Sequence, residues 1–212
     1  VGLWYLVLAA VTVMADPALA SGVRIALAVT FAGAVVALHA RGPLRRASLA
    51  VRTPLLVGAH AFVILALSRS WENVPLALTA GAVLVVTIGA LALAMPTRSR
   101  FVYGGAAFAY ALVLVGTALA YLGLDAVVVL CTVTSVAGAV AVAATYARWV
   151  PSRMWLAILA VTSVPFGLGV LQVVLERSGW TALSTFVIFL LALSLVPTTR
   201  EGLGVVVRAL AA

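Results

Sequence analysis

Lysine is absent from the 212-residue chain, and all 13 of its basic residues are arginine. Without a lysine amine, the chain cannot form a retinal or pyridoxal Schiff base or supply the lysine of a phosphate-binding loop. The single cysteine, Cys131, excludes an internal disulfide and a thiolate metal cluster. The two histidines, His39 and His60, cannot complete a three-histidine zinc site, so the sequence indicates no metal and no cofactor.

Charge is scarce as well, because only 8% of the residues are charged while 66% are hydrophobic. Soluble domains carry roughly 45–50% apolar and about 25% charged residues. So few polar groups cannot cover a surface that faces water, and we predict an all-α, polytopic integral membrane protein. The net charge of +8 does not indicate nucleic acid as a partner, because the arginines lie in short breaks between apolar segments.

Apolar segments alternate with these breaks along the whole chain. The predicted spans are about 2–15, 22–40, 54–69, 74–95, 101–122, 126–147, 153–175 and 180–197. A helix needs about 20 residues to cross about 30 Å of hydrocarbon, so the first and third spans are short. Most prolines lie at predicted boundaries, as Pro54 does, which supports the segmentation. We therefore expect about eight transmembrane helices in one domain, 1–212, with no soluble domain and with a loop over 41–53.

The arginines predict the orientation of these helices. If the N-terminus is cytoplasmic, the inner side holds Arg41, Arg45, Arg46, Arg52, Arg98, Arg100, Arg148, Arg153, Arg200 and Arg208. The outer side then holds only Arg24, Arg69 and Arg177. This positive-inside bias predicts cytoplasmic N- and C-termini in the plasma membrane, and the preference for arginine, alanine and valine is typical of a GC-rich bacterium.

The middle of the seventh span is the most informative stretch for function. The candidate pathway residues in this stretch are Thr162, Ser163, Pro165, Gly167 and Gly169, and Gln172 lies further along the same span. Proline lacks an N–H and glycine has low helix propensity, so this helix is expected to be broken. Freed carbonyls at membrane depth can line a substrate pathway, whereas an ordinary proline kink that aids packing is the alternative. In the sixth span, Cys131–Ser135 is a run of small and polar residues that favours helix packing.

His60 is the ionisable residue that lies well inside a span, and it joins the pathway candidates. It could relay protons or contact a substrate, or it could be a neutral histidine bonded to a backbone carbonyl or to a hydroxyl of another helix. His39 is expected to be an anchor at the inner interface. The aromatic belts at the interfaces are predicted to contain Trp4, Tyr5, Trp71, Trp149, Trp155 and Trp180.

Four acids are predicted on the outer side, opposite most of the arginines. They are Asp16, Glu72, Asp125 and Glu176. They could form a rim that attracts cations or supply an acid/base pair for catalysis. Capping of the following helices by Glu72 and Asp125 is the alternative.

Hairpins of alanine and valine punctuated by arginine are similar to the multi-span subunits of actinobacterial type VII secretion systems, although no motif is shared and no residue is carried over. We expect a transport protein, or the membrane subunit of a transporter, for a neutral or apolar solute. A structural or sensory module of a larger assembly such as a secretion complex, and an intramembrane enzyme acting on a lipid or isoprenoid, are the alternatives. The expected partner is the lipid bilayer, with partner membrane subunits or a soluble cytoplasmic subunit left open.

Overall fold

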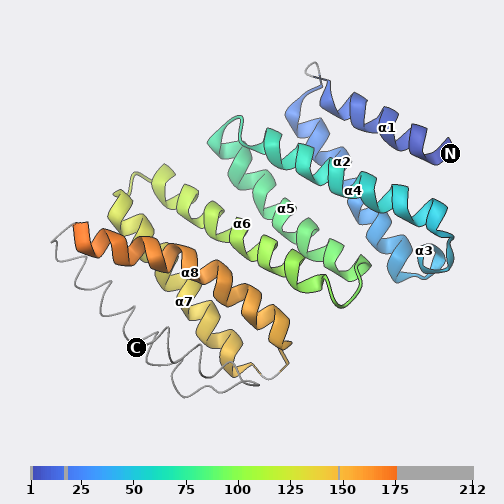
Figure 1. The fold of residues 1–212 in the computed structure, drawn as a ribbon. Coiled ribbons are helices and arrows are strands. Elements are labelled where there is room, and N and C mark those ends of the chain that lie inside the picture. The colour runs from blue at the N-terminus through green and yellow to red at the C-terminus, as the bar shows by residue number, and fades with distance from the viewer. Residues whose placement is uncertain (1, 17–18, 148, 176–212) are drawn as a thin grey trace. The chain divides into compact units, whose positions relative to one another are not determined.

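The computed structural model describes residues 2–16, 19–147 and 149–175, and within these ranges the chain is helical with no strand (Figure 1). The helices are α1 (Gly2–Ala15), α2 (Ser21–Ala40), α3 (Pro43–Arg46), α4 (Leu49–Ser70), α5 (Val74–Ala94), α6 (Arg100–Tyr121), α7 (Ala126–Tyr146) and α8 (Ser152–Leu175). The predicted all-α class is therefore confirmed for this part of the chain. The span expected at 180–197 lies outside the described residues, together with Arg148, Glu176, Arg177, Trp180, Arg200 and Arg208.

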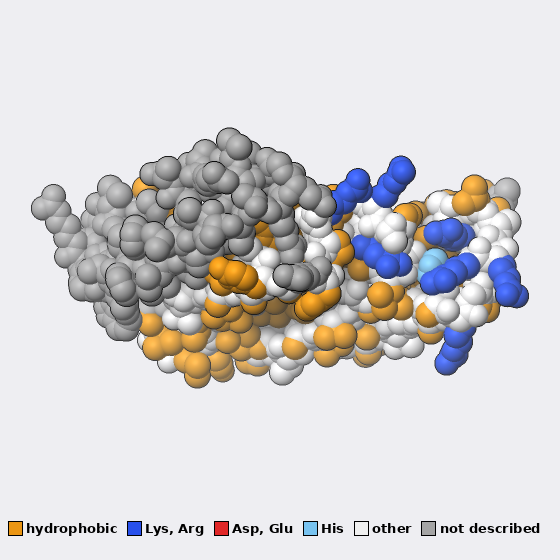
Figure 2. Space-filling view, turned by 90° about the horizontal axis from the view of Figure 1, so that it is seen from below, with side chains coloured by type: hydrophobic (Ala, Val, Ile, Leu, Met, Phe, Trp, Pro, Cys, Tyr) orange, Lys and Arg blue, Asp and Glu red, His pale blue; other side chains and the backbone are white. Residues whose placement is uncertain are grey.

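Six of these helices are long and apolar enough to cross a membrane, namely α2 and α4–α8. Apolar side chains also cover much of the surface seen in Figure 2. The chain is therefore a multi-pass membrane protein in class. Helix α1 has 14 residues and is about 21 Å long at about 1.5 Å per residue, which is shorter than the hydrocarbon layer.

The short third span, predicted from about residue 54, is extended by neighbouring residues, because α4 begins at Leu49 and has 22 residues. Pro54 lies inside the helix and is buried. A proline this close to a helix start removes only one early backbone hydrogen bond, the one to Ala50, so the helix continues through it. The loop predicted over 41–53 is also shorter, because it contains the single-turn helix α3.

The chain divides into two compact units, residues 1–114 and 115–212, with α6 running through the boundary. In unit 1, α2 packs against α4 and α5, and α1 packs against α4. The core of unit 1 uses small residues, among them the fully buried Ala28, Ala32, Ala59 and Ala66. Small side chains let helix backbones approach closely, which is the usual way in which helices associate in lipid.

Two glycines mark the tightest contacts in unit 1. A Cβ atom on Gly58 would lie 2.9 Å from Val7 and 3.4 Å from Phe31, which belong to α1 and α2. A Cβ atom on Gly81 would lie 2.6 Å from the side chain of Leu114. Only glycine fits at these positions without a shift of the neighbouring side chains.

In the described part of unit 2, α7 and α8 form a packed hairpin. Trp155 is completely buried there, and its indole N–H donates to the hydroxyl of Thr145 at 2.8 Å. The prediction that Trp155 belongs to an interfacial belt is therefore wrong, because a partner for the indole N–H lies inside the hairpin. Trp4, Trp71 and Trp149 are exposed and fit the predicted belts.

Candidate functional site

The candidate pathway segment of α8 is a continuous helix around Pro165. Helix α8 runs without interruption from Ser152 to Leu175, so the expected break does not occur. Pro165 removes only one backbone hydrogen bond from the helix. Pro165 is buried, and its carbonyl accepts a hydrogen bond from the Thr134 hydroxyl of α7 at 3.1 Å. This interhelical bond identifies Thr134, in the polar run of α7, as a packing residue.

The candidate residues of α8 divide between two faces. Thr162, Pro165 and Gly169 are buried at helical spacing, and the Thr162 hydroxyl lies 2.8 Å from the Ile158 carbonyl and 3.3 Å from the Ala137 carbonyl of α7.

Ser163 and Gly167 belong to the other, exposed face of α8. The Ser163 hydroxyl donates to the Ala160 carbonyl at 2.7 Å, and a Cβ atom on Gly167 would meet nothing within 4 Å. The side chain of Gln172 lies outside the described residues. The face of α8 with Pro165 therefore packs against α7, and the face with Ser163 and Gly167 does not.

His60 joins α4 to α6 at about the middle of α4. Its Nδ1 lies 2.5 Å from the carbonyl of Leu56, and its Nε2 is hydrogen bonded to the hydroxyl of Tyr103. Because a carbonyl can only accept, a neutral ring carries its proton on Nδ1 and accepts the Tyr103 O–H at Nε2. Both ring nitrogens therefore have protein partners, so that His60 links α4 to α6.

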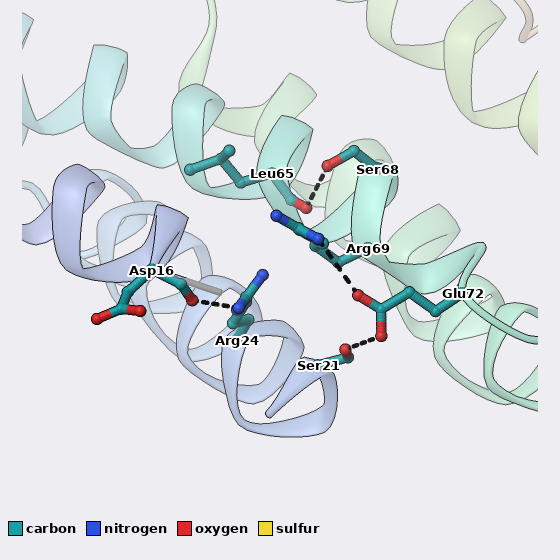
Figure 3. A network of polar contacts seen from close by, with 7 residues as sticks. All are labelled: Asp16, Ser21, Arg24, Leu65, Ser68, Arg69 and Glu72. Carbon is teal, nitrogen blue, oxygen red and sulfur yellow. Dashed lines mark hydrogen bonds and ion pairs between the residues drawn. The ribbon is translucent and has the colours of Figure 1, made fainter. Parts of the chain in front are cut away.

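Two of the four acids expected on the outer side, Asp16 and Glu72, lie at one end of unit 1, in the network that Figure 3 shows. Asp125 belongs to unit 2, and Glu176 lies outside the described residues. The two carboxylate oxygens of Glu72 are engaged separately, one by the Ser21 hydroxyl and the other by Arg69 at 3.5 Å. Asp16 contributes its backbone carbonyl, which accepts from Arg24, while its carboxylate points away from Arg24. The arrangement ties the start of α2 to the end of α4.

Arg24 is an unexpected member of this network. It is only 1% exposed, and its Nε and Nη1 atoms have no hydrogen-bond partner. The sequence places Arg24 at the outer end of a span but does not show that the side chain is buried. Burial of a guanidinium with one backbone acceptor is costly, so this end of unit 1 is held at some expense in stability.

Of the two capping roles considered for acids, that of Glu72 is wrong and that of Asp125 is confirmed in position only. Asn73, not Glu72, caps α5, since its side-chain oxygen accepts the Leu76 N–H at 2.8 Å. Asp125 does occupy the N-cap position of α7, but its side chain makes no capping hydrogen bond. Asparagine is as good a cap as aspartate and stands one residue nearer the helix than Glu72. Glu176 lies outside the described residues.

An apolar groove lies between α1, α2 and α4 and has a volume of about 550 Å³. Its lining residues are Ala9, Ala10, Val13, Met14, Leu27, Thr30, Phe31, Ala34 and Phe62. Phe31 and Phe62 contact each other edge to face, with ring centroids 4.8 Å apart. The Thr30 hydroxyl is bonded to the Ala26 carbonyl at 2.7 Å, so the groove presents almost no free polar group.

Sequence reasoning missed this groove. Helices α1 and α2 are apolar on every side, so hydropathy does not show which of their faces turn toward each other. Gly58 is the residue in the sequence that could have indicated close packing here, because a glycine lets Val7 of α1 and Phe31 of α2 approach α4.

His39 is not an interfacial anchor, as the sequence suggested, because it is only 7% exposed. In residues 2–16, 19–147 and 149–175, no three histidine, cysteine or acidic side chains gather where they could hold a metal ion. Comparison of the chain with models of protein families, with curated proteins and with solved structures finds no match. The functional assignment therefore depends on the geometry of the helices alone.

Proposed function

We propose that this chain is a multi-span membrane transport protein, or the membrane subunit of a transporter, and that the groove between α1, α2 and α4 receives an apolar solute. The observation that carries the proposal is the lining of the groove, in which Thr30 is the one polar residue. A groove without a free donor, acceptor or charge favours a molecule that needs none. Its volume is within the roughly 300–1,000 Å³ typical of small-molecule sites.

The position of the groove along its helices supports an apolar occupant. Leu27, Phe31 and Ala34 lie in the middle of α2, far from both ends of that span. Phe62 lies in the middle of α4. A solute at this depth is surrounded by hydrocarbon rather than water, so an acyl or isoprenoid chain is the chemistry that the site suits.

The remaining parts of the proposal concern the pathway and the topology. The exposed face of α8 with Ser163 and Gly167 is a separate candidate pathway surface within unit 2. In unit 1, the partners of His60 support a role in linking α4 to α6. We also propose eight spans with both termini in the cytoplasm of a bacterial plasma membrane. The six long apolar helices support this topology, as does the gathering of arginines at one end of unit 1.

A structural module of a larger assembly is the second candidate, because α2 leaves small residues open. Ala26, Gly33 and Ala34 are exposed, and a Cβ atom on Gly33 would meet nothing within 4 Å. Small exposed residues are the usual contact surface between membrane helices. Another membrane chain that co-purifies with the wild type but not with Gly33→Leu would favour this candidate. An enzyme has less support, because Glu72 is already engaged by Ser21 and Arg69.

Filling the groove tests the proposed site. We expect a long-chain alcohol bearing a diazirine to label lining residues of the wild-type protein, and labelling at Phe31 and Val13 to be lost in Ala34→Trp. Ala26→Trp is the matched control, because Ala26 is also exposed on α2 but does not line the groove. Equal labelling of the two variants would exclude the groove as the binding site.

A flux measurement tests transport separately. Proteoliposomes containing wild-type protein should move a fluorescent, net-neutral phospholipid analogue between leaflets faster than protein-free liposomes do. Ala34→Trp should return the rate to the protein-free level, and Ala26→Trp should leave it unchanged. A wild-type rate equal to that of empty liposomes would contradict transport of this lipid class even if labelling of the groove persists.

A further inference from the structure

One end of unit 1 carries only positive charge. Its arginines follow α2, form the end of α3, open α4 and surround the start of α6; they are Arg41, Arg45, Arg46, Arg52, Arg98 and Arg100. We call these residues the arginine end. Figure 2 shows arginine side chains gathered around a histidine on one face of the molecule, with no acidic side chain in view. Within the described residues of unit 1, the acids Asp16 and Glu72 both lie at the opposite end.

His39 lies in the last turn of α2, at the arginine end, and Arg45, Arg52 and Arg100 reach the same end from α3, α4 and α6. His39 is 7% exposed, and its Nδ1 has no hydrogen-bond partner. A buried ring nitrogen left unpaired at the end where the arginines gather is unfavourable, and a bound anion there would offset the mutual repulsion of the arginines.

The backbone that carries these arginines is held in place by helices rather than lying in an extended loop. Gly42 turns the chain with a φ of 97°, which favours glycine, and Pro43 starts α3. Leu44 is 3% exposed and anchors α3 in the core, so that Arg45 remains at the surface. On α6, the Nε of Arg100 donates to the Met95 carbonyl at 3.3 Å, which fixes that side chain against the end of α5.

The chemistry and the depth of this site select the ligand. Planar guanidinium groups bind phosphate oxygens through paired hydrogen bonds. In the described part of the arginine end, no carboxylate is present to occupy these guanidinium groups instead. The arginines stand at the ends of helices that are long enough to cross the bilayer, which is the level of the lipid headgroups. Basic clusters of about four to eight residues in this position are typical of anionic-lipid recognition.

We propose that Arg45, Arg52 and Arg100 form a binding site above His39 for the phosphate group of an anionic phospholipid. Arg41, Arg46 and Arg98 surround the site and add attraction without binding the phosphate. The site depends on the membrane class of the protein and is independent of transport through the groove, which lies along α1 and the middle of α2. Its failure would therefore leave the proposed function untouched.

The test compares two triple variants of the full chain with the same loss of charge. The site variant is Arg45→Gln/Arg52→Gln/Arg100→Gln. Retention of phosphatidylglycerol over phosphatidylcholine is measured by native mass spectrometry after release from mixed-lipid nanodiscs. We expect the site variant to lower this preference at least about tenfold, since it loses the paired hydrogen bonds to the phosphate in addition to the charge that both triples lose.

The matched control is Arg41→Gln/Arg46→Gln/Arg98→Gln, which should change the preference much less. Equal losses in the two triples would overturn the proposal and indicate diffuse attraction to the whole arginine end. If the site variant does not insert or fold, Arg45→Lys/Arg52→Lys/Arg100→Lys keeps the charge but removes the paired geometry. An unchanged lipid preference in this lysine triple would also overturn the proposal.

A competition arm distinguishes a lipid headgroup from free phosphate. Inorganic phosphate at constant ionic strength should not displace bound phosphatidylglycerol, because the acyl chains hold the lipid at the site. Displacement by phosphate but not by an equal ionic strength of chloride would assign the site to a soluble phosphate compound and contradict the lipid assignment.

Discussion

The α7–α8 hairpin and the helices of unit 1 are held together by different means. In the hairpin, Thr134, Thr162 and Trp155 each reach the neighbouring helix with a polar atom, along most of its length. In the interior of unit 1, α1, α2, α4 and α5 meet through alanines and Gly58, and α5 meets Leu114 of α6 at Gly81. The polar links of unit 1 lie at its outer end and between α4 and α6. Lipid is as apolar as these side chains, so helices must gain either close contact or hydrogen bonds in order to associate.

This difference predicts that the stability of the two regions responds to opposite kinds of substitution. The hairpin should respond to the loss of a single polar atom or of its one large buried side chain. Unit 1 should respond to the gain of a single carbon atom. The variants below test this contrast through the free energy of unfolding, measured by titration of detergent-solubilised protein with SDS.

The largest effect is expected for Trp155→Ala in the hairpin. Trp155 is completely buried, so the variant leaves a large cavity and should lower the free energy of unfolding by about 3–5 kcal/mol. Trp155→Phe removes the hydrogen bond to Thr145 but keeps most of the packing, and it should cost about 1 kcal/mol. A loss in Trp155→Ala no greater than that in Trp149→Ala, which alters an exposed side chain, would contradict the burial.

Gly81→Ala should be the next largest, with a loss of about 1–3 kcal/mol from overpacking against Leu114. The second variant Gly81→Ala/Leu114→Ala removes the clashing side chain, so the two changes together should cost less than the sum of the single changes. Gly33→Ala is the control, because a Cβ atom there meets nothing within 4 Å. Strict additivity of the pair would show that the two residues are not in contact.

Thr134→Val keeps the shape of the side chain and removes its bond to the Pro165 carbonyl. We expect a loss of about 0.6–1.7 kcal/mol, the range measured for hydrogen bonds between membrane helices. Thr132→Val is the control, because the Thr132 hydroxyl donates to Val128 within its own helix. If both variants lose the same stability, the bond to Pro165 has no special role.

Tyr103→Phe should have the smallest effect, about 0.6 kcal/mol, because it removes one hydrogen bond from His60 and leaves the other to Leu56. The side-chain NMR signal of His60 should shift while those of the hairpin do not. An unchanged His60 signal would show that the ring does not contact Tyr103.

The sequence predicted much of the helix map but not the effect of its prolines. The bounds expected for the first, fourth and sixth spans agree with α1, α5 and α7 to within one residue. Pro54 and Pro165 misled the prediction because both lie inside continuous helices. In lipid, a backbone that leaves the helix loses several hydrogen bonds at once, whereas a proline in the helix loses one.

Of the candidate site, the sequence could identify residue types but not their neighbours. It singled out His60 and Thr162, yet Tyr103 and Ala137, which bond them, come from other helices. The burial of Arg24, His39 and Trp155 was likewise hidden.

The amino-acid sequence by itself determined that this protein is helical and built for a bilayer, and it placed the arginines at the ends of helices. These properties follow from hydropathy and length, because a chain in hydrocarbon must satisfy its backbone within each helix. Only the tertiary structure decided which faces meet, where the apolar groove opens, and that His39 is buried at the end where the arginines gather. Spans that are apolar all round carry no mark of their partners, so that information arises only when the helices pack.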